Sequence, residues 1–216
     1  MQTKWNILQS YTCHIRTILV QDFHTELDEK SIIILLNPPS PITVPLFPNL
    51  HTLLCKYTEK NMHLLRLPLP SLVLLDVEFK SPHLFQNSLK LFPKFSLNIK
   101  SLSFGVHHLE AMFKFSKIEP NYIHHWKNLC SVTLACPQVT LDVKALLLLS
   151  CMPTLTQLTF ALNAALPTSN TPLFFTGLHE MTLYSESLHW VSWFLSQTQL
   201  LAITNFTAFI QSYPSR

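Results

Sequence analysis

The 216-residue sequence predicts an α/β fold in which short parallel strands stack side by side along the chain, with helices or irregular segments on the other side. Three observations predict this fold. One apolar pattern recurs along the chain, the position between its last two apolar residues is mostly polar, and a similar proline-containing turn precedes several copies. With 48% hydrophobic and 12% charged residues, the chain is too apolar to be disordered, and we expect one domain over residues 1–216.

The recurring pattern is apolar-x-x-apolar-x-apolar. Its last two apolar positions are i and i+2 of a strand, so their side chains point to one face. The first positions of successive copies are separated by 35, 22, 27, 30, 26 and 23 residues, and five of these steps lie in or close to the range of leucine-rich repeats. The sequence therefore predicts an irregular leucine-rich-repeat solenoid of about seven repeats, with 1–14 as an N-terminal flank and 200–216 as an eighth repeat or a tail. The copies are Ile15-x-x-Ile18-x-Val20, Leu50-x-x-Leu53-x-Cys55, Leu72-x-x-Leu75-x-Val77, Ile99-x-x-Leu102-x-Phe104, Leu129-x-x-Val132-x-Leu134, Leu155-x-x-Leu158-x-Phe160 and Leu178-x-x-Met181-x-Leu183.

The outward positions of these strands form the candidate binding surface. In a solenoid of this kind the strands line the concave face, and the residue between the two inward positions is polar in five of the seven copies. A hydroxyl-rich surface of low charge favours hydrogen bonding to a protein partner over electrostatic steering. The candidate residues are Thr52, Leu54, Lys56, Leu74, Asp76, Glu78, Ser101, Ser103, Ser131, Thr133, Gln157, Thr159, Glu180, Thr182 and Tyr184.

Strand entry is marked by proline at Pro48, Pro70 and Pro153, each followed two residues later by leucine. Proline lacks a backbone donor and stops a helix, so it fits the turn that leads into a strand. At the position where an asparagine would commonly ladder its amide along the spine, only Asn163 could do so. We therefore expect uneven curvature.

Three helices are predicted on the convex side. Thr25-x-x-Asp28 resembles a capping box that opens a helix over 26–36. Thr140 is the expected cap of a helix over 141–151, and Ser185 or Ser187 the expected cap of a helix that runs to Ser196. Residues 166–172 are expected to form a loop.

The sequence carries no recognisable enzyme signature. Its two glycines, Gly105 and Gly177, are too far apart for the glycine-rich loops that bind nucleotides or for the nucleophile elbow of hydrolases. The pairs His107-His108 and His124-His125 match no metal-ligand spacing, and Trp190 with Trp193 fit a core flank better than a docking site. We expect no catalytic residue, no metal and no cofactor.

Charge and cysteine content bear on partners and compartment. The net charge of +3 comes without a basic run, so no nucleic-acid partner is expected, and the longest apolar runs, of five residues, are too short to span a membrane. Without a secretory signal, the five cysteines are expected to be reduced core residues of a cytoplasmic or nuclear protein. They are Cys13, Cys55, Cys130, Cys136 and Cys151.

Over roughly residues 5–203, the chain resembles the leucine-rich-repeat region of the F-box-like proteins of mushroom-forming fungi. Trp5-Asn6-Ile7-Leu8-Gln9-Ser10-Tyr11 followed by Ile15-Arg16-Thr17-Ile18 is similar to the family's W-x-x-f-x-x-Y-x-x-x-V-R-x-L opening. Leu46-Phe47-Pro48-Asn49-Leu50-His51-Thr52-Leu53 is similar to its L-F-P-N-L-R-T-L strand, with His51 in place of the usual arginine. The order of elements over 128–195 also follows the family.

The resemblance implies a non-catalytic recognition module, similar to the repeats that select the target of an F-box ubiquitin ligase. The sequence holds no L-P-x-E-[IL]-L motif, so binding of a Skp1-type adaptor is expected only if an F-box lies upstream. Two alternatives remain at this point: a truncated family member without a ligase role, either a free-standing binding module or a relic, and an enzyme of an unrecognised kind.

Overall fold

An open, mostly parallel sheet with few helices forms the main body of the protein, as a computed structural model shows. The α/β class predicted from the sequence is thereby confirmed. The structure describes residues 2–20, 45–57, 67–79, 88, 98–106, 116–118, 123, 126–134, 139–141, 143–162 and 172–210. The helix predicted over 26–36 and most of the loop predicted over 166–172 lie outside these residues.

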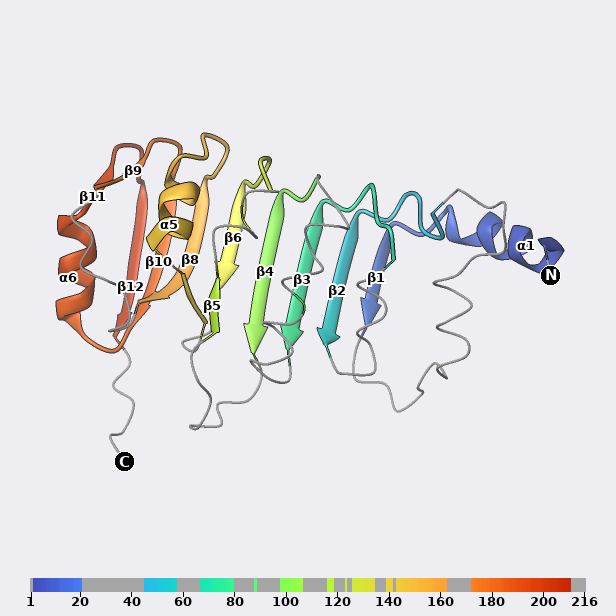
Figure 1. Ribbon diagram of the computed structural model, residues 1–216, viewed down its shortest axis with the longest axis horizontal. Helices are drawn as coiled ribbons and strands as arrows, with labels where there is room; N and C mark the ends of the chain where they lie inside the picture. The colour runs from blue at the N-terminus through green and yellow to red at the C-terminus, as the bar shows by residue number, and fades with distance from the viewer. Residues whose placement is uncertain are drawn as a thin grey trace, which may run out of the picture.

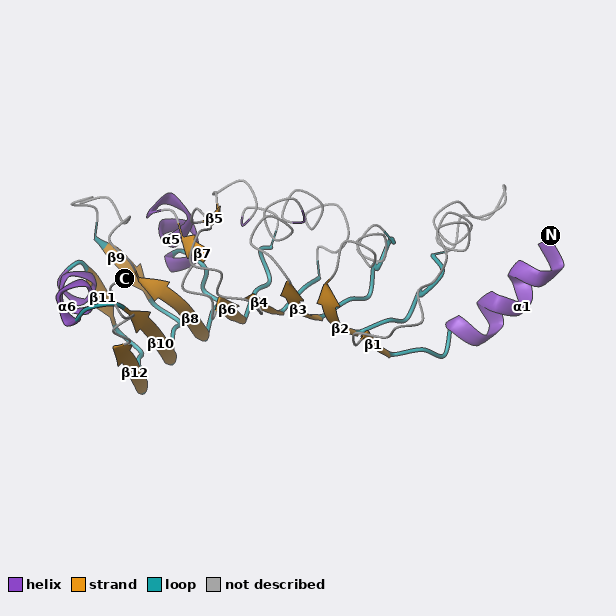
Figure 2. Ribbon diagram, turned by 90° about the horizontal axis from the view of Figure 1, so that it is seen from below, coloured by secondary structure: helices purple, strands orange, loops and turns teal. Residues whose placement is uncertain are grey.

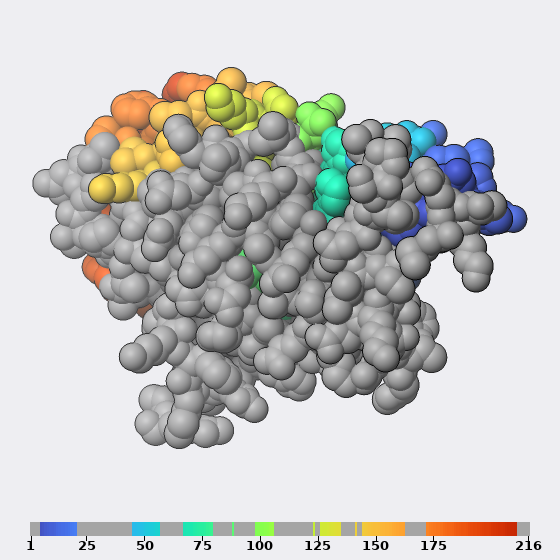
Figure 3. Space-filling view, turned by 45° about the vertical axis from the view of Figure 1, so that its right-hand side comes forward, coloured from blue at the N-terminus to red at the C-terminus, as the bar shows by residue number. Residues whose placement is uncertain are grey.

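Eight strands of this sheet lie side by side in the order of the sequence, and every pair of neighbours is parallel (Figure 1). In the space-filling view, the colours of the described residues likewise run in chain order across the molecule (Figure 3). The strands are β1 (Thr17–Val20), β2 (Thr52–Tyr57), β3 (Leu74–Phe79), β4 (Ser101–Val106), β6 (Ser131–Leu134), β8 (Gln157–Leu162), β10 (Glu180–Ser185) and β12 (Asn205–Ile210).

The first seven of these strands coincide with the seven predicted copies of the apolar pattern. Thr17 pairs with Thr52, 35 positions further along, and Thr52 pairs with Leu74, 22 positions further along. The later registers reproduce the predicted steps of 27, 30, 26 and 23 residues in the same way. Within 200–216, β12 adds an eighth parallel strand that pairs with β10.

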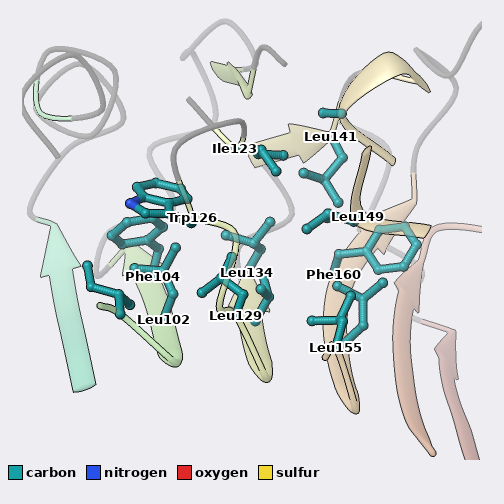
Figure 4. Close-up of a cluster of buried hydrophobic side chains, with 14 of the residues drawn as sticks. Leu102, Phe104, Ile123, Trp126, Leu129, Leu134, Leu141, Leu149, Leu155 and Phe160 are labelled. Atoms are coloured by element: carbon teal, nitrogen blue, oxygen red, sulfur yellow. The ribbon is translucent and has the colours of Figure 1, made fainter. Parts of the chain in front are cut away.

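Alternation along the strands separates a buried face from an outward face. Both inward residues of the pattern are buried in each strand from β2 to β10, for example Leu75 with Val77 and Met181 with Leu183. Figure 4 shows Phe104, Leu134 and Phe160 on the same side of the sheet as Leu141 and Leu149, which come from the other layer. The core therefore fills the space between the main sheet and the elements that cover one of its faces.

Those covering elements are α5 (Val143–Ser150), α6 (Leu188–Ser196) and short strands. α5 packs against β9 (Leu173–Phe175), and α6 packs against β10 and β11 (Thr198–Leu200). β9 pairs with β11, while β5 (Ser116–Ile118) pairs with β7 (Val139–Leu141), which joins β8. The apolar side chains of α6 contribute directly to the core, where the rings of Phe194 and Phe160 meet edge to face, 5.5 Å apart.

Some details of the predicted helices are wrong. Thr140 lies inside β7, so it does not cap a helix, and α5 begins later, at Val143. Ser187 is the N-cap residue of α6 but makes no side-chain capping hydrogen bond. The N-terminal flank contains a helix, α1 (Gln2–Thr12), that the sequence analysis did not predict.

A repeated backbone contact joins the entrance of each strand to the strand before it. The carbonyl oxygen of Arg16 accepts hydrogen bonds from the N–H groups of both His51 and Thr52, at 2.9 and 3.0 Å. The carbonyl of His51 does the same for the next strand, and the arrangement continues to the carbonyl of His179. Each carbonyl has two lone pairs, so one oxygen can hold two donors. This contact fixes where each strand begins relative to its neighbour.

Side chains in the turns before β2, β3 and β4 add a second connection. Asn49 donates to the Cys13 carbonyl at 2.8 Å, Ser71 to the Pro48 carbonyl at 2.6 Å and Asn98 to the Pro70 carbonyl at 2.9 Å. These residues directly precede the first apolar position of their repeats. The corresponding residue before Leu178 is Gly177, and a Cβ atom built there would lie 2.6 Å from the Pro153 carbonyl oxygen. Glycine is required at this turn because the backbone itself approaches the preceding repeat.

The two glycines make a matched pair of stability tests. We expect Gly177→Ala to destabilise the protein by about 1–3 kcal/mol, because backbone must shift to admit the new methyl group. Gly105→Ala should be neutral or stabilise by up to about 1 kcal/mol, because its Cβ would meet no described atom closer than the Glu78 Cγ, at 3.7 Å, and alanine loses less backbone entropy in a strand. Urea unfolding of both variants measures the difference. Equal stability of the two variants would contradict the close approach at Gly177.

Candidate protein-binding surface

The outward face of the main sheet is concave and uncovered by any element that the structure describes. Viewed along the strands, the sheet is arched, with α5 on its convex side and no described helix or strand on its concave side (Figure 2). The outward side chains are half-buried or exposed over most of this face. An uncovered sheet face of this shape is accessible to a partner molecule.

Strand register arranges the outward side chains of the concave face in three rows. The first row begins with Thr17 and Thr52, the second with Leu19 and Leu54, and the third with Lys56. Neighbouring strands lie about 4.8 Å apart, so each residue contacts its counterparts in the adjoining strands. The fifteen candidate residues all occupy these rows, and none of them is buried: Thr52, Leu54, Lys56, Leu74, Asp76, Glu78, Ser101, Ser103, Ser131, Thr133, Gln157, Thr159, Glu180, Thr182 and Tyr184.

Five neighbouring strands each place a hydroxyl group in the second row. We call this set the hydroxyl row; it consists of Ser103, Thr133, Thr159, Thr182 and Thr207. No hydrogen bond of these side-chain hydroxyls is found within the described part of the chain, so each can donate and accept toward a partner. At the usual strand spacing, the row extends over roughly 19 Å.

At the N-terminal end of the concave face lies a hollow of about 340 Å³ that spans β1 to β4. Its lining includes the apolar side chains of Leu19 and Leu54, the carboxylates of Asp76 and Glu78, and the ammonium group of Lys56. Lys56 and Glu78 form an ion pair at 3.7 Å, with both side chains more than one third exposed. Such a pair is screened by water and contributes little to stability.

At the C-terminal end, the third row carries an aromatic pair. The rings of Tyr184 and Phe209 stack at 5.1 Å with an interplanar angle of 14°. Phe209 is 46% exposed, which is high for such a ring. The concave face thus changes along its length from a charged hollow, through hydroxyl groups, to exposed aromatic rings.

Sequence reasoning missed part of this surface. Thr207 and Phe209 belong to β12, which the sequence predicts only as one of two alternatives, and Leu19, in β1, is not among the predicted candidate residues. A signal for Thr207 was present, because Phe206, Ala208 and Ile210 alternate with Asn205, Thr207 and Phe209. Phe209, an apolar residue among the outward positions, interrupts this alternation and makes it weak.

The other chemically suggestive residues do not converge on a reactive site within the described residues. No group of three or more His, Cys, Asp or Glu side chains is placed there to hold a metal ion. Both histidine pairs, His107-His108 and His124-His125, lie outside the described residues. Trp190 and Trp193 are half-buried, 6.5 Å apart, and pack against the core.

The described cysteines have different environments and form no disulfide with one another. Cys55 is buried, as predicted, and burial raises the pKa of its thiol to about 12. Cys151 is exposed, so its prediction as a core residue is wrong. It follows the last residue of α5, where the chain turns toward β8 and the side chain lies outside the core.

Comparison with known proteins identifies no relative. No family model, no curated protein and no solved structure matches the chain.

None of the helices in the described part of the chain combines the length and the apolar character needed to cross a lipid bilayer.

We expect the cysteines to differ in their reaction with a thiol-alkylating reagent. At pH 8 the native protein should be labelled rapidly at Cys151 and very slowly at Cys55, because a buried thiol with a raised pKa has almost no thiolate. Peptide mass spectrometry after timed labelling measures both rates, and labelling in denaturant should make them similar. Fast labelling of Cys55 in the native protein would contradict its burial.

Proposed function

We propose that this protein is a leucine-rich-repeat recognition module that binds a partner protein on its concave strand face and catalyses no reaction. In this proposal the chain forms an irregular solenoid of about eight repeats. The protein acts in the cytoplasm or nucleus. The repeat spacing of 22 to 35 residues and the strands in sequence order support the solenoid part of the proposal. The hydroxyl row carries the binding part, because no described element covers it and its side chains make no hydrogen bond with the described residues.

The chemistry of the hydroxyl row favours a protein ligand. Serine and threonine can donate and accept hydrogen bonds, so they match the peptide groups and polar side chains of a protein surface. Their short side chains lose little conformational entropy on binding, which reduces the free energy cost of association. Exposed aromatic rings at Tyr184 and Phe209 add residues of the kind enriched at binding hot spots.

Within this proposal the bound protein would be the target selected for a ubiquitin ligase, as the family resemblance implies. The link to a ligase needs an F-box, which is not among these 216 residues. Target binding and adaptor binding are therefore separate questions, and the concave face concerns only the first.

Replacement of Thr133, Thr159 and Thr182 together by arginine tests the binding surface. We expect the triple variant to lose partner capture while its melting temperature stays close to that of the wild type, because the three side chains point away from the core. The measurement is quantitative mass spectrometry of proteins retained by the immobilised chain from an extract of its own source organism.

The matched control carries the same three added charges elsewhere, as Asn6→Arg, Ser192→Arg and Gln199→Arg, at exposed positions on α1, α6 and β11. Proteins retained by the wild type and the control but lost from the triple variant would support the proposal. Equal retention by all three chains would refute it.

A further inference from the structure

The charges on the concave face are opposite in sign to the net charge of the chain. Among the outward positions of the eight main strands, three residues are acidic, Asp76, Glu78 and Glu180, and one is basic, Lys56. The whole chain carries a formal net charge of +3. The face that the proposed function assigns to partner binding is therefore negative, and it complements a basic surface.

Two of the three carboxylates lie in the hollow between β1 and β4. Asp76 and Glu78 are i and i+2 on β3, so they point to the same face about 7 Å apart. Glu78 already pairs with Lys56, whereas no cation lies within ion-pair distance of Asp76 in the described part of the chain. Asp76 is exposed, so its carboxylate is available to a cation that enters the hollow.

The hollow also offers an apolar wall beside these carboxylates. Leu54 is the register neighbour of Asp76, and Leu19 is the register neighbour of Leu54. Leu19 is 54% exposed, so its side chain offers apolar surface for contact. Long basic side chains lay their aliphatic stems on apolar surfaces of this kind and keep the charged group at the polar end.

Gly105 leaves space in the hollow because it has no side chain. It follows Glu78 in the third row, and among the described residues only the Glu78 Cγ would lie within 4 Å of a Cβ atom there. The volume of about 340 Å³ is at the lower end of the range for small-molecule sites and suits a single inserted side chain. Shape, charge and apolar surface therefore coincide in one place.

We propose that this hollow receives the arginine side chain of the partner protein, with its stem on Leu19 and Leu54 and its guanidinium group at Asp76 and Glu78. Arginine suits the site better than lysine, because its planar fork can bond to two carboxylates at once. The inference rests on the proposed function in that it treats the concave face as the binding face. Lys56 competes with the incoming cation for Glu78 and lowers its affinity.

The test uses short synthetic peptides and does not require the natural partner. Acetylated, amidated pentapeptides with arginine, norleucine or glutamate at the centre of a Gly/Ser background are titrated into the isotope-labelled full chain, and backbone amide shifts are followed by NMR. We expect the arginine peptide alone to bind saturably, with shifts confined to the residues around Asp76 and Gly105.

Three variants locate the interaction. Asp76→Asn should weaken binding of the arginine peptide by about tenfold, because it removes a charged acceptor. Lys56→Gln should strengthen binding, because it removes the ammonium group that pairs with Glu78 at 3.7 Å. Glu186→Gln, at an exposed position between β10 and α6, should leave binding unchanged. The amide spectrum away from the hollow reports whether each variant is folded.

Binding of the norleucine peptide as tightly as the arginine peptide, shifts outside the hollow, or unchanged affinity of both Asp76→Asn and Lys56→Gln would each overturn the inference. If the triple arginine variant loses partner capture but the arginine peptide does not bind, the arginine site in the hollow is refuted and the wider binding face is supported. Arginine binding at the hollow without any effect of the triple variant on capture would instead refute the wider binding face.

Discussion

The structure depends on a single backbone contact that is repeated at every strand entrance, where one carbonyl oxygen accepts two N–H groups of the following strand. Side chains alternate between the two faces of a strand, so a shift of one residue in register would turn every core side chain outward. The repeated contact excludes that shift at seven successive junctions. Both the continuous apolar core and the aligned outward rows follow from it.

Much of the main sheet could be predicted because burial imposes a strict pattern. A strand with one buried face needs apolar residues at alternate positions, and Leu75 with Val77 or Leu158 with Phe160 supply them regardless of the length of the connections. The pairing registers of the strands could be predicted for the same reason, because each copy of the apolar pattern marks the positions that pair with those of the next copy. The resemblance to a known family was not needed for this part of the prediction.

The missed elements lack a pattern that burial would impose. In α1, Trp5 is buried while Ile7 and Tyr11 are 55% and 70% exposed, so its apolar residues do not form one continuous stripe. The short strands β5, β7, β9 and β11 have three residues each, too few for a period to be recognised. Thr140 has the chemistry of a helix cap, but pairing with β5 and β8 places it in a strand.

The sequence predicts which residues of the candidate site point outward, but it does not predict the shape of the surface that they form. Outward positions follow directly from the inward ones, so Thr133, Thr159 and Thr182 were identified from alternation alone. The hollow could not be identified in this way, because it depends on the coincidence of Gly105, Glu78 and Leu54 across three strands. Residues that are 22 or more positions apart in sequence give no sign that they line one hollow until the sheet places them together.

The contact at the strand entrance also separates two kinds of evolutionary change. Because register is set at each entrance, insertions and deletions in the connections between strands leave the outward rows aligned, and the observed steps range from 22 to 35 residues. Substitutions in the outward rows in turn leave the buried columns intact. A protein built in this way can change the chemistry of its outward surface through single substitutions, without passing through sequences that fail to fold.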